Sequence, residues 1–249
     1  NDVWLLVDAN GIGTPYWTQL LPIGNAPTPR EYITSAYDSV NNRLIIFGGF
    51  EVTSSGITRF NDTWILTHAN GLGGVPEWSP LAPNGTPPSP RSEASAIYNS
   101  ASNEMILFGG LTSSVSTSNE TWVLKNANGL DGTPEWVEIA ISGDLPLGRW
   151  GQSTGFSPTS NNVVMAMGRN DTPNSSSLLN DVWVLGTTSL SIELDVKPND
   201  SSNSLNPSSK GVIPVAILST SEFDAMSVNP SSIRFGLNEA TIVHKQGHI

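Results

Sequence analysis

The phrase NDVW at residues 1–4 returns as NDTW at 61–64, as NETW at 119–122 and as NDVW at 180–183, in steps of 60, 58 and 61 residues. Other landmarks keep nearly the same step and the same order along the chain. They are the Pro-x-Trp phrases ending at Trp17, Trp78 and Trp136, and the arginines that close Pro-rich stretches, Arg30, Arg91 and Arg149. Self-similarity at such a period predicts a supersecondary unit repeated along the chain.

Each repeat predicts four short strands. In the first complete repeat these are PREYITSAY at 29–37, the apolar run LIIFGG at 44–49, the NDTW phrase at 61–64 and the segment around Trp78. The chain contains 23 Gly and 18 Pro, which favours short strands joined by tight turns. Four strands in roughly 60 residues are typical of one β-propeller blade, so the sequence predicts an all-β fold.

The order of these landmarks resembles kelch repeats. Gly-Gly follows the second strand, Asn-Asp-x-Trp opens the third, a single Trp lies in the fourth, and an Arg opens the next unit. The resemblance covers residues 1–186 and implies a partial kelch-type β-propeller, similar to the central domain of galactose oxidase. We expect half a blade, two complete blades and three strands of another, about three to four blades in all. In the last copy Met167 replaces the first glycine, so we expect a different bend there.

The repeat ends near Gly186. We expect a linker at 187–190 and a small, incomplete C-terminal β-module at 191–249, in which SIELDVKP, KGVIPVAILS and SIRFG are β-like runs. This module resembles one found at the ends of large exported bacterial and archaeal proteins, and the resemblance implies an extracellular or cell-surface location. Because the chain starts inside a repeat and shows no leader peptide, we expect it to be a fragment of a multidomain protein.

Composition excludes several classes of partner. The net charge is −11, and the few Lys and Arg form no cluster that would neutralise phosphates, so we expect no nucleic acid. No run of about 18 apolar residues occurs, so we expect no membrane insertion. The absence of Cys excludes disulfides and thiolate metal sites. The sequence leaves the oligomeric state open.

Catalytic motifs have structural explanations in this chain. The string GQSTG at 151–155 matches the Gly-x-Ser-x-Gly of serine hydrolases, but Ser153 is in repeat register with Ser95 and Thr34, on a predicted inner strand. Copper chemistry of the galactose-oxidase kind needs a Cys-crosslinked Tyr, and the chain has no Cys. We therefore expect no catalytic residue, no metal and no cofactor in these residues. The acids of the repeated phrase are interpreted as turn caps: Asp2, Asp62, Glu120 and Asp181.

The candidate binding residues are Arg30, Arg91 and Arg149. Each opens the predicted innermost strand, so they are expected to gather at one mouth of the propeller channel, where guanidinium groups suit acidic ligands. The alternative is that each Arg bonds backbone carbonyls between blades and stacks on an aromatic ring. Loops that vary between the repeats emerge on the same face, where binding usually occurs.

The favoured hypothesis is a non-enzymatic binding or scaffold module of an exported multidomain protein. Its ligand would be a protein or a carbohydrate bound on one propeller face. The alternatives are a propeller enzyme, oxidase-like or glycan-modifying, whose catalytic residues lie on blades outside this sequence, and a structural spacer of the cell surface.

Overall fold

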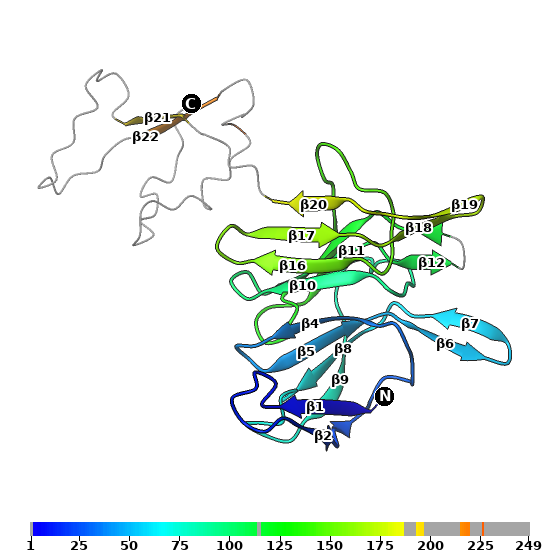
Figure 1. Ribbon diagram of the computed structural model, residues 1–249. Coiled ribbons are helices and arrows are strands. Elements are labelled where there is room, and N and C mark those ends of the chain that lie inside the picture. Colours follow the sequence, from blue (N-terminus) through cyan, green and yellow to red (C-terminus); the bar gives the residue numbers. More distant parts are fainter. Residues whose placement is uncertain (1, 114–115, 187–192, 197–214, 220–225, 227–249) are drawn as a thin grey trace, which may run out of the picture. The chain divides into compact units, whose positions relative to one another are not determined.

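The computed structural model describes residues 2–113, 116–186, 193–196, 215–219 and 226 (Figure 1). The chain divides into two compact units, Asn1–Thr187 and Thr188–Ile249. In the described part of the chain, every secondary-structure element longer than one residue is a β-strand. This confirms the predicted all-β class.

The first unit consists of successive antiparallel blades in the predicted order. The inner strands are β4 (Thr34–Asp38), β10 (Ser95–Asn99) and β16 (Ser153–Ser157), and the second strands are β5 (Arg43–Phe47), β11 (Glu104–Phe108) and β17 (Asn162–Ala166). The third strands are β1 (Val3–Val7), β8 (Thr63–Thr67), β14 (Thr121–Lys125) and β20 (Val182–Leu185), and the fourth strands are β2 (Tyr16–Leu20), β9 (Glu77–Leu81) and β15 (Glu135–Ile139). A short strand, β3 (Ile23–Gly24), adds to β9 in parallel.

The strand pairing gives half a blade, two complete blades and three strands of another. The half blade is β1–β2, the complete blades follow the orders β4-β5-β8-β9 and β10-β11-β14-β15, and the last is β16-β17-β20. Inner strand β10 contacts both β4 and β16, so successive blades turn about a common inner edge. The predicted partial propeller of successive blades is confirmed.

Short hairpins occupy the segments that the sequence analysis treated as variable loops. They are β6 (Phe50–Thr53) with β7 (Gly56–Arg59), β12 (Leu111–Ser113) with β13 (Ser116–Thr117), and β18 (Arg169–Thr172) with β19 (Ser175–Leu178). Each connects the second strand of a blade to its third, and all of them lie toward the right of Figure 1. In each hairpin the two segments pair with each other in antiparallel fashion, directly before the NDVW-type phrase that opens the third strand.

The main core lies between the two complete blades. Trp136 of β15 is 3% exposed and packs edge-on against Phe47 of β5, with ring centroids 5.0 Å apart. Its indole Nε1 donates a hydrogen bond to the Thr63 hydroxyl at 3.4 Å. The rest of this cluster comes from β4, β5 and β8 of one blade and from β11, β14 and the turn after β14 in the next: Ala36, Ile45, Ile65, Met105, Leu107, Trp122, Leu124 and Ala127. The fourth-strand tryptophan of one blade therefore seals the interface with the blade before it.

The expected change of bend at Met167 is wrong. Met167 has a φ of 62°, close to the 67° of Gly48 and the 71° of Gly109 at the same repeat position. A Cβ at Gly48 would lie 2.5 Å from the carbonyl oxygen of Arg91 in the next blade. The glycine is required by this close approach, and Met167 is 52% exposed, without a described blade against it.

The second unit contains β21 (Glu193–Val196) and β22 (Val215–Leu218), which pair antiparallel. These strands fall within the SIELDVKP and KGVIPVAILS runs. The SIRFG run lies outside the described residues. The predicted boundaries at 186 and 191 stay a prediction.

Candidate binding face

The side chain of Arg91 ties together one end of its own blade. Its Nε donates to the Ser89 carbonyl, its Nη1 to the Gly109 carbonyl, and its Nη2 to the Ser89 hydroxyl and, at 2.5 Å, to Glu120. The same Glu120 oxygen accepts a hydrogen bond from the indole of Trp122 at 3.0 Å. The arginine is completely buried, so its charge is neutralised by a carboxylate rather than by water.

This arrangement, which we call the Arg–acid–Trp brace, recurs in every blade that has the three residues. Its members are Arg30 with Asp62 and Trp64, Arg91 with Glu120 and Trp122, and Arg149 with Asp181 and Trp183. Arg30 also lies over the Phe60 ring, 3.9 Å from its centroid. The backbone of the arginine links blades as well, because Gly49 N donates to Arg91 O at 2.9 Å.

The carboxylates of the braces are held in their charged form. For Glu120, burial raises the pKa, but hydrogen bonds from Arg91 and Trp122 lower it by more, so the pKa lies below its ordinary value. The pKa of Asp62 is lowered by the same balance. At Asp181 the hydrogen bond from its arginine is the largest influence and holds the pKa far below the usual range. Each brace is therefore an ion pair across the neutral pH range.

In the braces, the arginines that the sequence analysis proposed for binding contact the acids that it interpreted as turn caps. The arginine side chains of the three braces are at most 5% exposed, and they point into the blades. A ligand-binding role for Arg30, Arg91 and Arg149 stays a prediction. The Asp62 carboxylate accepts hydrogen bonds from Arg30 and from the Trp64 indole as well as from its own backbone N–H, so the interpretation of the acids as turn caps stays a prediction.

Two residues beyond each arginine, the backbone takes an unusual conformation. Tyr32, Glu93 and Gly151 have φ values of 54°, 59° and 66°. Glu93 N donates to Tyr32 O at 3.0 Å, and Gly151 N donates to Glu93 O at 3.3 Å. Left-handed backbone is costly for Tyr and Glu, and such strain clusters where a protein binds ligands. The strained residues form a continuous row across the start of three inner strands.

The row continues into the first hairpin. Tyr32 is 55% exposed and stacks on Phe50 of β6, with ring centroids 5.5 Å apart. Arg59, which pairs with Phe50 across the hairpin, places its guanidinium carbon 5.8 Å from the same ring. Arg59 Nε is buried and has no hydrogen-bond partner among the described residues. An exposed aromatic surface thus adjoins a cation with an unused donor.

Acidic groups surround the middle of the row. Burial raises the pKa of the half-buried Glu93, and the negative charges of Glu31 and Asp171 add to that effect, while the charge of Arg59 opposes it. Asp171 accepts hydrogen bonds from Trp150 and Arg169. Because Glu93 is poorly compensated, this surface favours a cation.

We call this surface the hairpin face: Glu31, Tyr32, Phe50, Arg59, Glu93, Trp150, Arg169 and Asp171. The sequence analysis expected the variable loops on one face, and Phe50, Arg59, Arg169 and Asp171 belong to those loops, but it singled out none of these residues as a site. The signal was present, since the position two beyond each repeated Arg changes from Tyr to Glu to Gly while the Arg stays constant. Among the described residues, no group of three or more His, Cys, Asp or Glu is placed to hold a metal ion. In the same part of the chain, no helix is long and apolar enough to cross a membrane.

Comparisons with known proteins found a matching family model and several similar proteins. A family model described as the KLHDC2/KLHL20/DRC7 Kelch-repeats domain matches residues 1–207. Dynein regulatory complex subunit 7 of Chlamydomonas reinhardtii is 36% identical over 89 residues, which are 35% of this chain and 7% of that protein. The solved structure of YjhT is similar with a TM-score of 0.41 and 19% identity, over 60% of this chain and 37% of that one. The match spans a small part of the curated relative.

Proposed function

Because this chain belongs to the KLHDC2/KLHL20/DRC7 Kelch-repeats domain family, we propose that it is a non-enzymatic binding module whose ligand is a protein segment held on the hairpin face. The observation that carries the proposal is the row of strained residues, Tyr32 and Glu93, together with the exposed Tyr32 ring stacked on the half-buried Phe50. Strain of this kind persists only where the surrounding structure enforces it. Neighbouring blades hold these residues in place, because Glu93 N donates to Tyr32 O and Gly151 N donates to Glu93 O.

The chemistry of the face suggests what the segment carries. Tyr32 and Phe50 offer aromatic surface to an apolar side chain. Glu93, with Glu31 and Asp171 nearby, offers negative charge to a Lys or Arg. We therefore propose a ligand segment with an apolar residue next to a basic one.

A peptide-display selection against the chain tests this proposal. We expect enriched peptides to contain an apolar–basic pair and to bind more weakly as salt increases. Tyr32→Ala should weaken their binding at least about tenfold, as expected for an aromatic hot spot. Tyr16→Ala is the matched control, because Tyr16 is 56% exposed but lies on β2, away from the hairpin face.

A second pair of variants separates the charge from the aromatic surface. Glu93→Gln should reduce both the affinity and its dependence on salt. Glu104→Gln, a half-buried glutamate on β11, should change neither. Binding that is indifferent to Tyr32 and Glu93 would refute the hairpin face as the site.

A carbohydrate ligand, an exported location and the enzyme alternative stay predictions from the sequence. Exposed serine and threonine in β18 and β19 are the feature compatible with a glycan. A glycan array on the same preparation distinguishes the two ligand classes, since the protein-segment proposal expects no specific glycan signal.

A further inference from the structure

Among the described residues, the third strand of the last blade has no fourth strand beside it. In the complete blades, β8 and β14 are each paired on their outer edge by a fourth strand, β9 and β15. β20 pairs with β17, and no described strand pairs with its other edge. Val182 and Val184 of β20 are 63% and 59% exposed. A free strand edge with apolar side chains is a template for one more strand.

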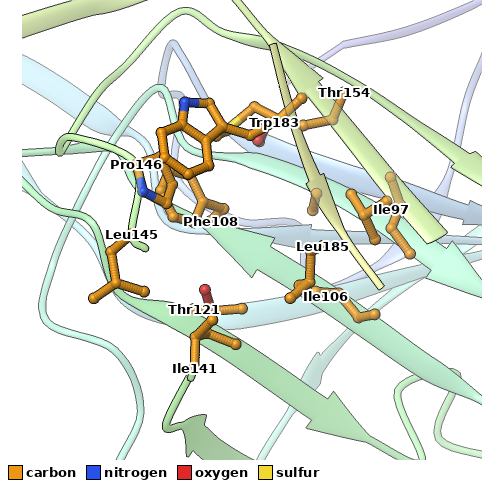
Figure 2. A pocket seen from close by; sticks show the side chains of 14 residues that line it. Ile97, Ile106, Phe108, Thr121, Ile141, Leu145, Pro146, Thr154, Trp183 and Leu185 are labelled. Atoms are coloured by element: carbon orange, nitrogen blue, oxygen red, sulfur yellow. The ribbon is translucent and has the colours of Figure 1, made fainter. Parts of the chain in front are cut away.

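An apolar pocket lies beside this edge, between the last complete blade and the three-stranded blade (Figure 2). The space among its lining side chains, with open solvent included, amounts to about 560 Å³. Figure 2 shows the Trp183 indole on one side, with Phe108, Leu145 and Pro146 around it and Thr121 below. We call the pocket and the free edge of β20 together the β20 socket.

The interface between the two complete blades shows which side chain fills the equivalent position. There Trp136 of β15 contacts Phe47 and donates to the Thr63 hydroxyl. Phe108 and Thr121 occupy the same repeat positions, because each phenylalanine ends the second strand opposite the first residue of the inner strand, and each threonine opens the third.

The other walls correspond in the same way. Ile97 and Ile106 of the pocket replace Ala36 and Ile45 of the filled interface. On the opposite wall, the pairs are Val163 for Met105, Met165 for Leu107, Trp183 for Trp122 and Leu185 for Leu124. No described residue takes the place of Trp136. The pocket is therefore the filled interface without its tryptophan.

We propose that the β20 socket accepts an extended segment of a partner polypeptide that carries a tryptophan. The segment adds antiparallel to β20, and its tryptophan lies opposite Leu185, as Trp136 lies opposite Leu124. Backbone hydrogen bonds along β20 supply affinity and the pocket supplies selectivity, which is strand addition to a sheet edge. The lining is almost wholly apolar, so an aromatic side chain is favoured over a charged one.

Two other sources of the strand fit less well. Residues 184–249 contain no tryptophan, and β21 is paired with β22. A second copy of the chain would present Trp4 or Trp17, which are 52% and 63% exposed, only as part of the β1–β2 pair and not on a single extended segment. A partner segment needs neither rearrangement.

The test uses the whole 249-residue chain and a fluorescent peptide with the sequence of residues 131–142, DGTPEWVEIAIS. Fluorescence anisotropy should show saturable binding. Replacing the tryptophan of the peptide by alanine should weaken binding roughly 30-fold, the loss typical of a buried aromatic anchor. Equal binding of the two peptides, or no binding of either, would overturn the proposal.

A matched pair of variants locates the site. Leu145→Asp puts a carboxylate in the pocket wall and should abolish the preference for tryptophan. Leu147→Asp adds the same charge two residues away, at a leucine that is also exposed, and should leave binding unchanged.

Two further measurements keep the test independent of folding and of self-association. A photoreactive phenylalanine at the tryptophan position of the peptide should crosslink to Phe108 or Met165, and crosslinks elsewhere would contradict the socket. A dimer in light scattering that Trp17→Ala dissociates, together with loss of peptide binding in the dimer, would assign the socket to a second copy and overturn the partner proposal.

Discussion

Breaking one brace should lower the free energy of unfolding of the first unit substantially, although the brace lies at the end of a blade. In the brace of Arg91, the guanidinium is completely buried and makes four hydrogen bonds, one of them to Glu120 at 2.5 Å. Glu120→Gln keeps the shape of the side chain but leaves a buried cation without a counter-charge. Removing one partner of a buried ion pair costs about 3–5 kcal/mol, and the 39% exposure of the Glu120 side chain places the expected loss near 3 kcal/mol.

The measurement is a double-mutant cycle in urea, with Glu120→Gln, Arg91→Met and the double variant. Because the two residues bond directly, the double variant should be more stable than the sum of the single losses by about 1–3 kcal/mol. The control is Arg169→Met, since Arg169 is 44% exposed in its pair with Asp171 and should cost less than about 1 kcal/mol. A loss below 1 kcal/mol for Glu120→Gln, or additive losses in the cycle, would refute the brace as a source of stability.

Three further predictions concern the same scaffold. In thermal unfolding, Gly48→Ala should destabilise the first unit by about 1–3 kcal/mol more than Gly151→Ala. Both glycines have φ near 67°, but only a Cβ at Gly48 would meet the Arg91 carbonyl. Equal losses would count against the contact between the blades. Trp136→Ala should cost about 3–5 kcal/mol in urea unfolding, whereas the 63% exposed Trp17 should tolerate alanine within about 0.5 kcal/mol; similar values would contradict the assigned core. The brace carboxylates have pKa values lowered by folding, so their contribution is complete above about pH 4.5 and is lost as the pH falls toward the lower folded values. Urea midpoints at pH 7 and pH 3 should therefore differ less for Arg91→Met than for the natural chain, and an equal difference would contradict the assignment.

The fold was predictable because the repeat itself contains the strand signals. The NDVW phrase and the Gly-Gly step recur in fixed order, and the pleat of each strand then decides which residues face the neighbouring blade. Even the incomplete first and last blades followed from counting these landmarks. The hairpin β18–β19 was missed because its residues 169–178 are largely polar and lack the alternation that identifies a half-buried strand.

The candidate site was harder to predict from the sequence, because it depends on contacts between residues that are far apart in the chain. Arg30 and Asp62 are 32 positions apart, and no local pattern pairs them. The left-handed backbone of Tyr32 is likewise imposed by neighbouring blades rather than by the preference of tyrosine. Conversely, Met167 adopts a glycine conformation where no described blade approaches it, which the sequence alone presents as a defect in the repeat.

Hydrogen–deuterium exchange with a selected peptide tests the central claim most directly, because it maps the bound surface without any substitution. The account predicts slower exchange in the hairpin face, at residues 31–33, 50–59 and 92–94, and no change in the turns at 39–42 and 68–76 at the opposite end of the blades. Protection confined to those turns, with the hairpin face unchanged, would contradict it.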